Sequence, residues 1–171
     1  MVERLGERKR EAEPAETLYD QSNRDINEKA RRREQGKVVI RGKEIPFQQS
    51  RHALLKYLLH RSDWDKVSVP YWSIFINHVK THSGRHTHQG GMGLYVLEGS
   101  GYTIVDGIKY PWKKNDLILL PIKPGGVEHQ HFNDDPDKPC QWIAFSFQPM
   151  KEAAAHRVIQ NEEHPDWMKT G

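Results

Sequence analysis

Two pairs of histidines, each with one residue between its members, are the residues of this sequence best suited to chemistry. The first pair is His86 and His88, and the second is His129 and His131. In a β-strand, residues i and i+2 point to the same face, so each pair can present both imidazoles to one side. Imidazole nitrogen is a common ligand of Fe, Mn, Ni, Cu and Zn. Because the chain holds ten histidines, either pair alone would be weak support, and it is the two together that predict a metal site.

The residues around these pairs have the pattern of short strands joined by turns. The dipeptide Asp106-Gly107 is a strong hairpin signal, since both positions tolerate the positive φ angles of a two-residue turn. We expect strands over residues 67–69, 72–78, 92–97, 102–105, 108–112, 117–121, 129–132 and 141–147. Short strands at regular spacing predict a sandwich or a barrel. Such a barrel could return the second histidine pair to the side of the first.

The chain before the strands is more polar and more charged. We expect a disordered tail over residues 1–13, a helix over residues 15–35 that ends at Gly36, and a short strand over residues 37–40. Ser50 is a suitable N-cap for a second helix over residues 51–60. These features predict three segments: a charged tail and helical arm (1–62), a β-barrel (63–150) and a polar C-terminal tail (151–171). We expect the C-terminal tail to be helical over residues 152–159.

Composition narrows the classes of function. Charged residues make up 29% of the chain, but the net charge is only +3. The short basic run Arg31-Arg32-Arg33 is typical of a solvated helix face, so we expect no nucleic-acid partner. Cys140 is the only cysteine, which excludes an internal disulfide and favours a reducing compartment. With no apolar leader and no run long enough for a bilayer, we expect a cytoplasmic protein without a membrane partner.

Two stretches of the sequence resemble the motifs of the cupin superfamily. The stretch from Gly84 to Gly101 resembles the first motif, in which an HxH pair is followed at a fixed offset by Glu-Gly, here Glu98-Gly99. The stretch from Pro124 to Asn133 resembles the second motif, PxGxxHxxxN. The resemblance implies an all-β fold, the cupin double-stranded β-helix or jelly-roll barrel, with a helical N-terminal arm and a metal inside the barrel.

The resemblance also implies a set of metal ligands and neighbours. Most cupins carry a glutamate after the second histidine as a fourth ligand, and here that position is Met92. The ligands implied are therefore His86, His88 and His129. Strand parity does not separate His129 from His131, but the motif offset favours His129. The resemblance further implies His131 and Asn133 as supports behind the ligands, and we expect Met92, Gln89 and Trp142 to contact substrate.

A three-histidine site without glutamate is similar to that of gentisate-type ring-cleaving dioxygenases, which hold Fe(II) and usually contain two cupin units. Three neutral imidazoles leave a divalent metal its full charge and open positions, which suits a bidentate anionic substrate together with dioxygen. We therefore expect a non-haem Fe(II) dioxygenase of a hydroxylated aromatic acid or a similar chelating small molecule. Mn, Ni or Zn are the alternative metals. The alternative functions are a metal-dependent lyase or isomerase and a cupin that binds a small ligand without catalysis. We also expect a homodimer, because pairing hides sheet edges.

Overall fold

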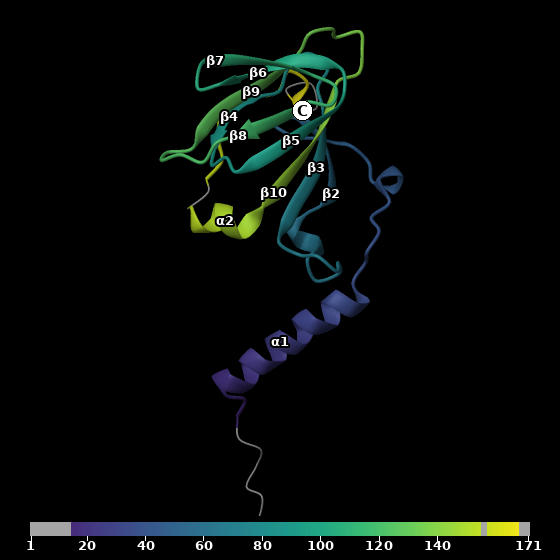
Figure 1. Ribbon diagram of the computed structural model, residues 1–171, viewed down its shortest axis with the longest axis vertical. Helices are drawn as coiled ribbons and strands as arrows, with labels where there is room; N and C mark the ends of the chain where they lie inside the picture. Colours follow the sequence, from purple (N-terminus) through teal and green to yellow (C-terminus); the bar gives the residue numbers. More distant parts are fainter. Residues whose placement is uncertain (1–14, 155–156, 168–171) are drawn as a thin grey trace, which may run out of the picture.

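The computed structural model describes residues 15–154 and 157–167. Two antiparallel sheets pack against each other and form the body of the molecule (Figure 1). In order across the larger sheet, the strands are β1 (Gln48–Gln49), β2 (Leu54–Leu59), β3 (Trp72–His78), β10 (Gln141–Phe147), β5 (Met92–Glu98) and β8 (Leu117–Leu120). Those of the smaller sheet are β11 (Ile159–Glu162), β4 (Arg85–His88), β9 (Val127–Asn133), β6 (Ser100–Val105) and β7 (Ile108–Lys113). The predicted all-β jelly roll is confirmed.

The core lies between the two sheets and follows from alternation along the strands. On β5, Met92, Leu94 and Val96 are buried, whereas Tyr95 between them is exposed. Its neighbour β10 contributes Trp142 to the same core. Because successive side chains of a strand point to opposite faces, one face of each sheet is committed to this apolar interior.

The hairpin between β6 and β7 forms as predicted. Asp106 and Gly107 have φ angles of 48° and 83°, and Val105 pairs with Ile108 across the turn. Positive φ at both central positions gives the turn a twist that matches the flanking strands. This hairpin places β6 beside β9, the strand that carries the second histidine pair.

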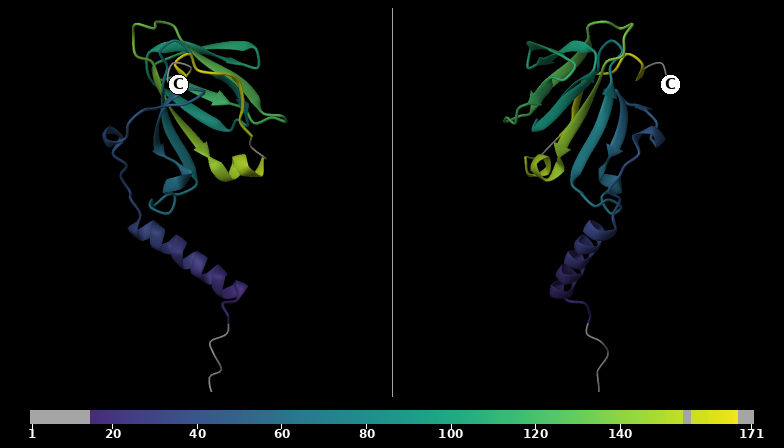
Figure 2. Two further views of the ribbon diagram at one scale, coloured as in Figure 1. Left: turned by 180° about the vertical axis from the view of Figure 1, so that it is seen from behind. Right: turned by 45° about the vertical axis from the view of Figure 1, so that its right-hand side comes forward.

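The N-terminal arm is the helix α1 (Leu18–Gln35), which confirms the expected helical arm. Thr17 and Asp20 form a capping box at its start, and the Gly36 amide donates to the Arg32 carbonyl at its end. None of its residues is buried. Both views in Figure 2 show the helix projecting away from the sheets. The predicted tail over residues 1–13 lies outside the described residues.

Several local predictions were wrong. Residues 51–60 were expected to be helical, but Leu54–Leu59 form β2, which pairs with β3 and buries Leu55. Sheet pairing therefore outweighs the helical propensity of leucine. Residues 37–40 and 67–69 form only one bridge, between Lys37 and Val67.

The C-terminal segment also differs from the expected helix over residues 152–159. It contains α2 (Gln148–Ala153) and then β11, which pairs with β4. The remaining elements are the 3₁₀ turns η1 (Gly42–Glu44) and η2 (Arg61–Asp63). The two sheets thus extend beyond residues 63–150 at both ends. Within the described residues, no helix combines the length and apolarity needed to cross a lipid bilayer.

Candidate metal centre

Strands β4 and β9 bring three histidines together. They pair antiparallel, with His86 directly opposite His129, and His88 points to the same face as His86. Nitrogen atoms of His86, His88 and His129 all lie within 4.8 Å of one another. The ring centroids of His86 and His129 are 4.3 Å apart, and those of His88 and His129 are 4.6 Å apart. The three histidines that the sequence predicts to lie together are therefore close to one another in the structure.

The backbone assigns the tautomer of each of these rings. The Nδ1 atoms of His86, His88 and His129 lie 3.3, 2.6 and 3.3 Å from the carbonyl oxygens of Gly84, Gln89 and Val127, respectively. A carbonyl oxygen only accepts, so each Nδ1 carries the proton and each Nε2 carries the lone pair. Fixing the tautomer in this way is what a metal-binding histidine requires of its surroundings.

Burial keeps the three rings neutral. It lowers the pKa of His86 to about 3, with the neighbouring His129 adding to the effect, and it lowers the pKa of His129 to about 4. Burial and then His129 also hold the pKa of His88 well below the ordinary value. Desolvation disfavours the charged imidazolium, so all three rings are neutral at pH 7. Neutral imidazole is the form that binds a metal, and these residues therefore fit a divalent ion.

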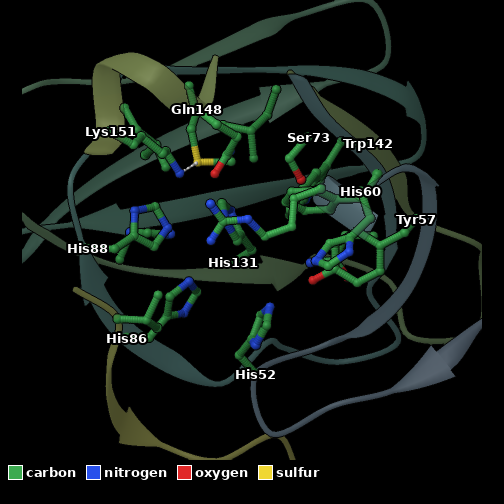
Figure 3. Close-up of a pocket in the computed structure, with 18 residues that line it drawn as sticks. His52, Tyr57, His60, Ser73, His86, His88, His131, Trp142, Gln148 and Lys151 are labelled. Carbon is green, nitrogen blue, oxygen red and sulfur yellow. Dashed lines mark hydrogen bonds between the residues drawn. The ribbon is translucent and has the colours of Figure 1, made fainter. Parts of the chain in front are cut away.

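The three histidines lie on one wall of a cavity of about 180 Å³ between the sheets (Figure 3). Apolar side chains, among them Met92, Leu94 and Trp142, form much of the remaining wall. Among residues 15–154 and 157–167, no Asp or Glu lines this cavity. A metal held by the histidines would therefore keep its full positive charge, since no carboxylate among these residues lies at the cavity to neutralise it.

The comparisons with known proteins agree with this geometry. Residues 74–146 match the family described as "Cupin domain". The barrel has the cupin fold. A gentisate 1,2-dioxygenase of Ralstonia sp. is 39% identical over 59 residues, which are 34% of this chain and 16% of that protein.

Solved structures show the same fold. The chain superposes on salicylate 1,2-dioxygenase from Pseudoaminobacter salicylatoxidans with a TM-score of 0.53 and 14% identity, covering 85% of this chain and 36% of that one. A double-stranded β-helix protein of Klebsiella pneumoniae gives a TM-score of 0.52 and 16% identity, covering 74% of this chain and 98% of that one. The chain thus spans well under half of the two dioxygenases.

His131, the other member of the second pair, lies outside the three-histidine group. It is 1% exposed, and its Nδ1 lies 2.8 Å from Thr103 Oγ1, which also accepts from Trp112 Nε1 at 2.9 Å. Its ring meets His129 edge to face, with centroids 5.4 Å apart. His131 therefore packs against His129, while its hydrogen bond is made with Thr103 in the core of the barrel.

Two of the expected site residues serve other purposes. Asn133 was expected behind the ligands, but its side-chain nitrogen donates to the carbonyls of Val79, Lys80 and Lys138, and its Oδ1 accepts from the Asp135 amide. It is the last residue of β9, where the chain leaves the sheet, and it ties the loop after β3 to the loop after β9. The hydrogen bonds of the Asn133 side chain thus go to loop backbone groups.

Gln89, which was expected to contact substrate, directs its side-chain amide to the loop before β9. Its Nε2 donates to the Lys123 carbonyl at 2.6 Å, and its Oε1 accepts from the Lys123 amide at 3.3 Å. Both ends of the side-chain amide are thus used to hold the loop before β9. Met92 and Trp142, which were also expected to contact substrate, line the cavity.

The cavity also contains residues that the sequence did not indicate. His52 approaches His86, with ring centroids 5.0 Å apart, and burial lowers the pKa of His52 to about 4. Tyr57 and His60 line the cavity from β2 and its end, and Lys151 lines it from α2. Lys151 had been assigned to a polar tail, although Pro149 just before it is a signal for the start of a helix. No sequence motif or spacing identifies His52 as a residue of the site.

Proposed function

We propose that this chain is a metal-dependent cupin enzyme, an Fe(II) dioxygenase that cleaves a hydroxylated aromatic acid or a similar chelating small molecule. The observation that carries the proposal is the group of three buried, neutral histidines beside a cavity that no carboxylate of the described residues lines. Such a site retains the full charge of a divalent ion, which favours an anionic, chelating substrate.

In this proposal His86, His88 and His129 hold the metal through Nε2. Bound Fe(II) would supply the activation of dioxygen and of the chelated substrate. The chain's own contribution is positional. The apolar side chains of Met92, Leu94 and Trp142 give an aromatic ring a surface to pack on. Burial of the site keeps bulk water away from the reacting groups, which strengthens every electrostatic interaction within it.

The similarity to a gentisate dioxygenase supports the reaction class, and the matched segment is short. It covers 16% of that protein, so the substrate is proposed from the chemistry of the site as well. Oxygen uptake tests the proposal. Protein loaded with Fe(II) under argon would be exposed to air with gentisate, salicylate, hydroxynaphthoate or a catechol-like acid.

We expect at least one of these acids to be consumed together with oxygen, and His86→Ala, as the matched control, to be inactive. Consumption of no oxygen with any of them would contradict the proposal. Turnover by zinc- or nickel-loaded protein without oxygen would instead identify a lyase or isomerase. Tight binding without turnover would identify a ligand-binding cupin.

A further inference from the structure

Lys151 is a buried lysine at the cavity and takes no part in the metal site. It lies on α2, directly after β10, and is only 6% exposed. Its Nζ donates to the Met92 sulfur at 3.1 Å, and Figure 3 shows it directed into the cavity beside His88. In the part of the chain that the structure describes, no carboxylate lies within ion-pair distance of it.

Keeping a positive charge buried in this position costs free energy. A buried ammonium normally requires a carboxylate or several strong acceptors, and a thioether sulfur is a weak acceptor. Burial correspondingly lowers the pKa of Lys151 to about 8, so the group is still charged at pH 7. Arg61 also lines the cavity, but it is exposed and already paired with Glu152. The uncompensated charge at this wall is therefore that of Lys151.

A ligand is the partner that this charge lacks. The cavity of about 180 Å³ is close to the size that holds one aromatic ring, since an apolar cavity of about 150 Å³ takes up benzene. A ring with one small anionic substituent would place that substituent between Lys151 and the three histidines. The opposite wall, with Tyr57 and His60, lies across the cavity in Figure 3.

We propose that Lys151 is the residue that selects the ligand of this cavity, by binding the carboxylate of a single-ring acid through its ammonium group. The inference rests on the site of the proposed function, because it takes the cavity beside the three histidines as the ligand site. It does not depend on the reaction, and it would hold equally for a lyase or a ligand-binding protein.

The test is calorimetric titration of the full-length chain loaded with zinc, which binds histidines without consuming oxygen. The two probes are salicylate and its neutral analogue salicylamide. The variants are Lys151→Met, which keeps the length of the side chain and removes its charge, and Lys114→Met, which removes the same charge from an exposed turn. Zinc content and the melting temperature are measured for each protein.

We expect Lys151→Met to weaken salicylate binding by about tenfold to a hundredfold, as for loss of a hydrogen bond to a charged group, and to leave salicylamide binding within about twofold. Lys114→Met should behave as the wild type. Equal losses for both probes, no loss, or a wild-type protein that binds neither probe would overturn the inference. If Lys151→Met did not fold, Lys151→Gln would replace it.

The two proposals fail in different ways. Salicylate binding that depends on Lys151, in a protein that consumes no oxygen with iron, would retain this inference and reject the dioxygenase. Oxygen consumption that is unchanged in Lys151→Met would retain the dioxygenase and reject this inference.

Discussion

Strands β4 and β9 each carry two histidines at positions i and i+2, and the two pairs have different surroundings. On β4, both His86 and His88 belong to the three-histidine group. On β9, His129 belongs to it, whereas His131 is buried further into the core against Thr103 and Trp142. All four rings are buried and share one face of the sheet, so neither burial nor strand parity distinguishes the candidate ligands.

The partner of Nδ1 distinguishes them. The three grouped histidines each place Nδ1 against a backbone carbonyl, which only accepts. His131 places Nδ1 against a hydroxyl that also serves Trp112. A carbonyl partner fixes one tautomer, while a hydroxyl can donate or accept and fixes none. In this fold, a hydrogen bond from Nδ1 to a backbone carbonyl identifies a histidine as a candidate ligand.

The strongest test of the difference between His129 and His131 is to remove one histidine of β9 at a time. We expect His129→Ala to purify without metal, because it loses a ligand. His131→Ala should still bind metal, with an affinity reduced by no more than about 10–100-fold, as for loss of a supporting residue. Metal content after dialysis against zinc measures both. Metal retained in His129→Ala and lost in His131→Ala would reverse the assignment.

Acid should destabilise the metal-free protein. The pKa values of His86 and His129 are lowered to about 3 and about 4, so in the folded state these rings stay neutral where an unfolded chain takes up protons. The stability they contribute is fully present above about pH 6.5 and is lost as pH falls towards 4, by about 1.4 kcal/mol per pH unit for each ring.

Urea unfolding of metal-free protein between pH 7 and pH 4.5 measures this loss. His86→Asn, which removes one titrating ring, should show a shallower slope than the wild type. A free energy of unfolding that does not change between pH 7 and pH 5 would contradict the burial described for the cluster.

Thr103→Val tests the hydroxyl that sets His131 apart. The change keeps the shape of a side chain that is 0% exposed but removes the partner of both His131 Nδ1 and Trp112 Nε1. Each buried group left without a partner costs about 1–3 kcal/mol. Urea unfolding should therefore show a loss of that size for one or both groups, with metal content unchanged. Loss of metal instead would mean that His131 acts as a ligand.

The smallest expected effect comes from comparing two buried tryptophans. Trp112 Nε1 donates to Thr103, whereas Trp142 Nε1 is buried without a hydrogen-bond partner among the described residues. Tryptophan→Phe removes the same atoms at both sites. We expect Trp112→Phe to lower the free energy of unfolding by about 1 kcal/mol more than Trp142→Phe, in line with one net hydrogen bond. Equal losses would show that the hydrogen bond from Trp112 to Thr103 contributes nothing to stability.

The parts of this molecule that could be predicted from sequence are those with local or motif signals. The regular succession of short strands and turns identified β5 and β10, and Asp106-Gly107 identified the hairpin between β6 and β7. The spacing of the histidines and the motif offset together selected the three that meet. Each of these signals is encoded within a few residues of the feature itself.

The remaining parts depend on contacts between distant segments. Residues 51–60 read as helical because of their leucines, and only the pairing with β3 makes them a strand. Gln89 and Asn133 have the polar character of site residues, but the loops nearby use their hydrogen-bonding groups first. Lys151 is brought to the cavity by the way α2 folds back after β10, and no pattern in the tail signals this.

The exposed arm also affects how a measured free energy of unfolding of this protein is interpreted. Because α1 buries no residue, its hydrogen bonds are not tied to the packing of the sheets. An isolated helix of this length is marginal in water and melts gradually. The chain thus comprises a cooperative unit, the barrel, and an element that exchanges with the coil almost independently. A free energy of unfolding measured in urea belongs to the barrel, and the helical signal of the arm forms part of the sloping baseline.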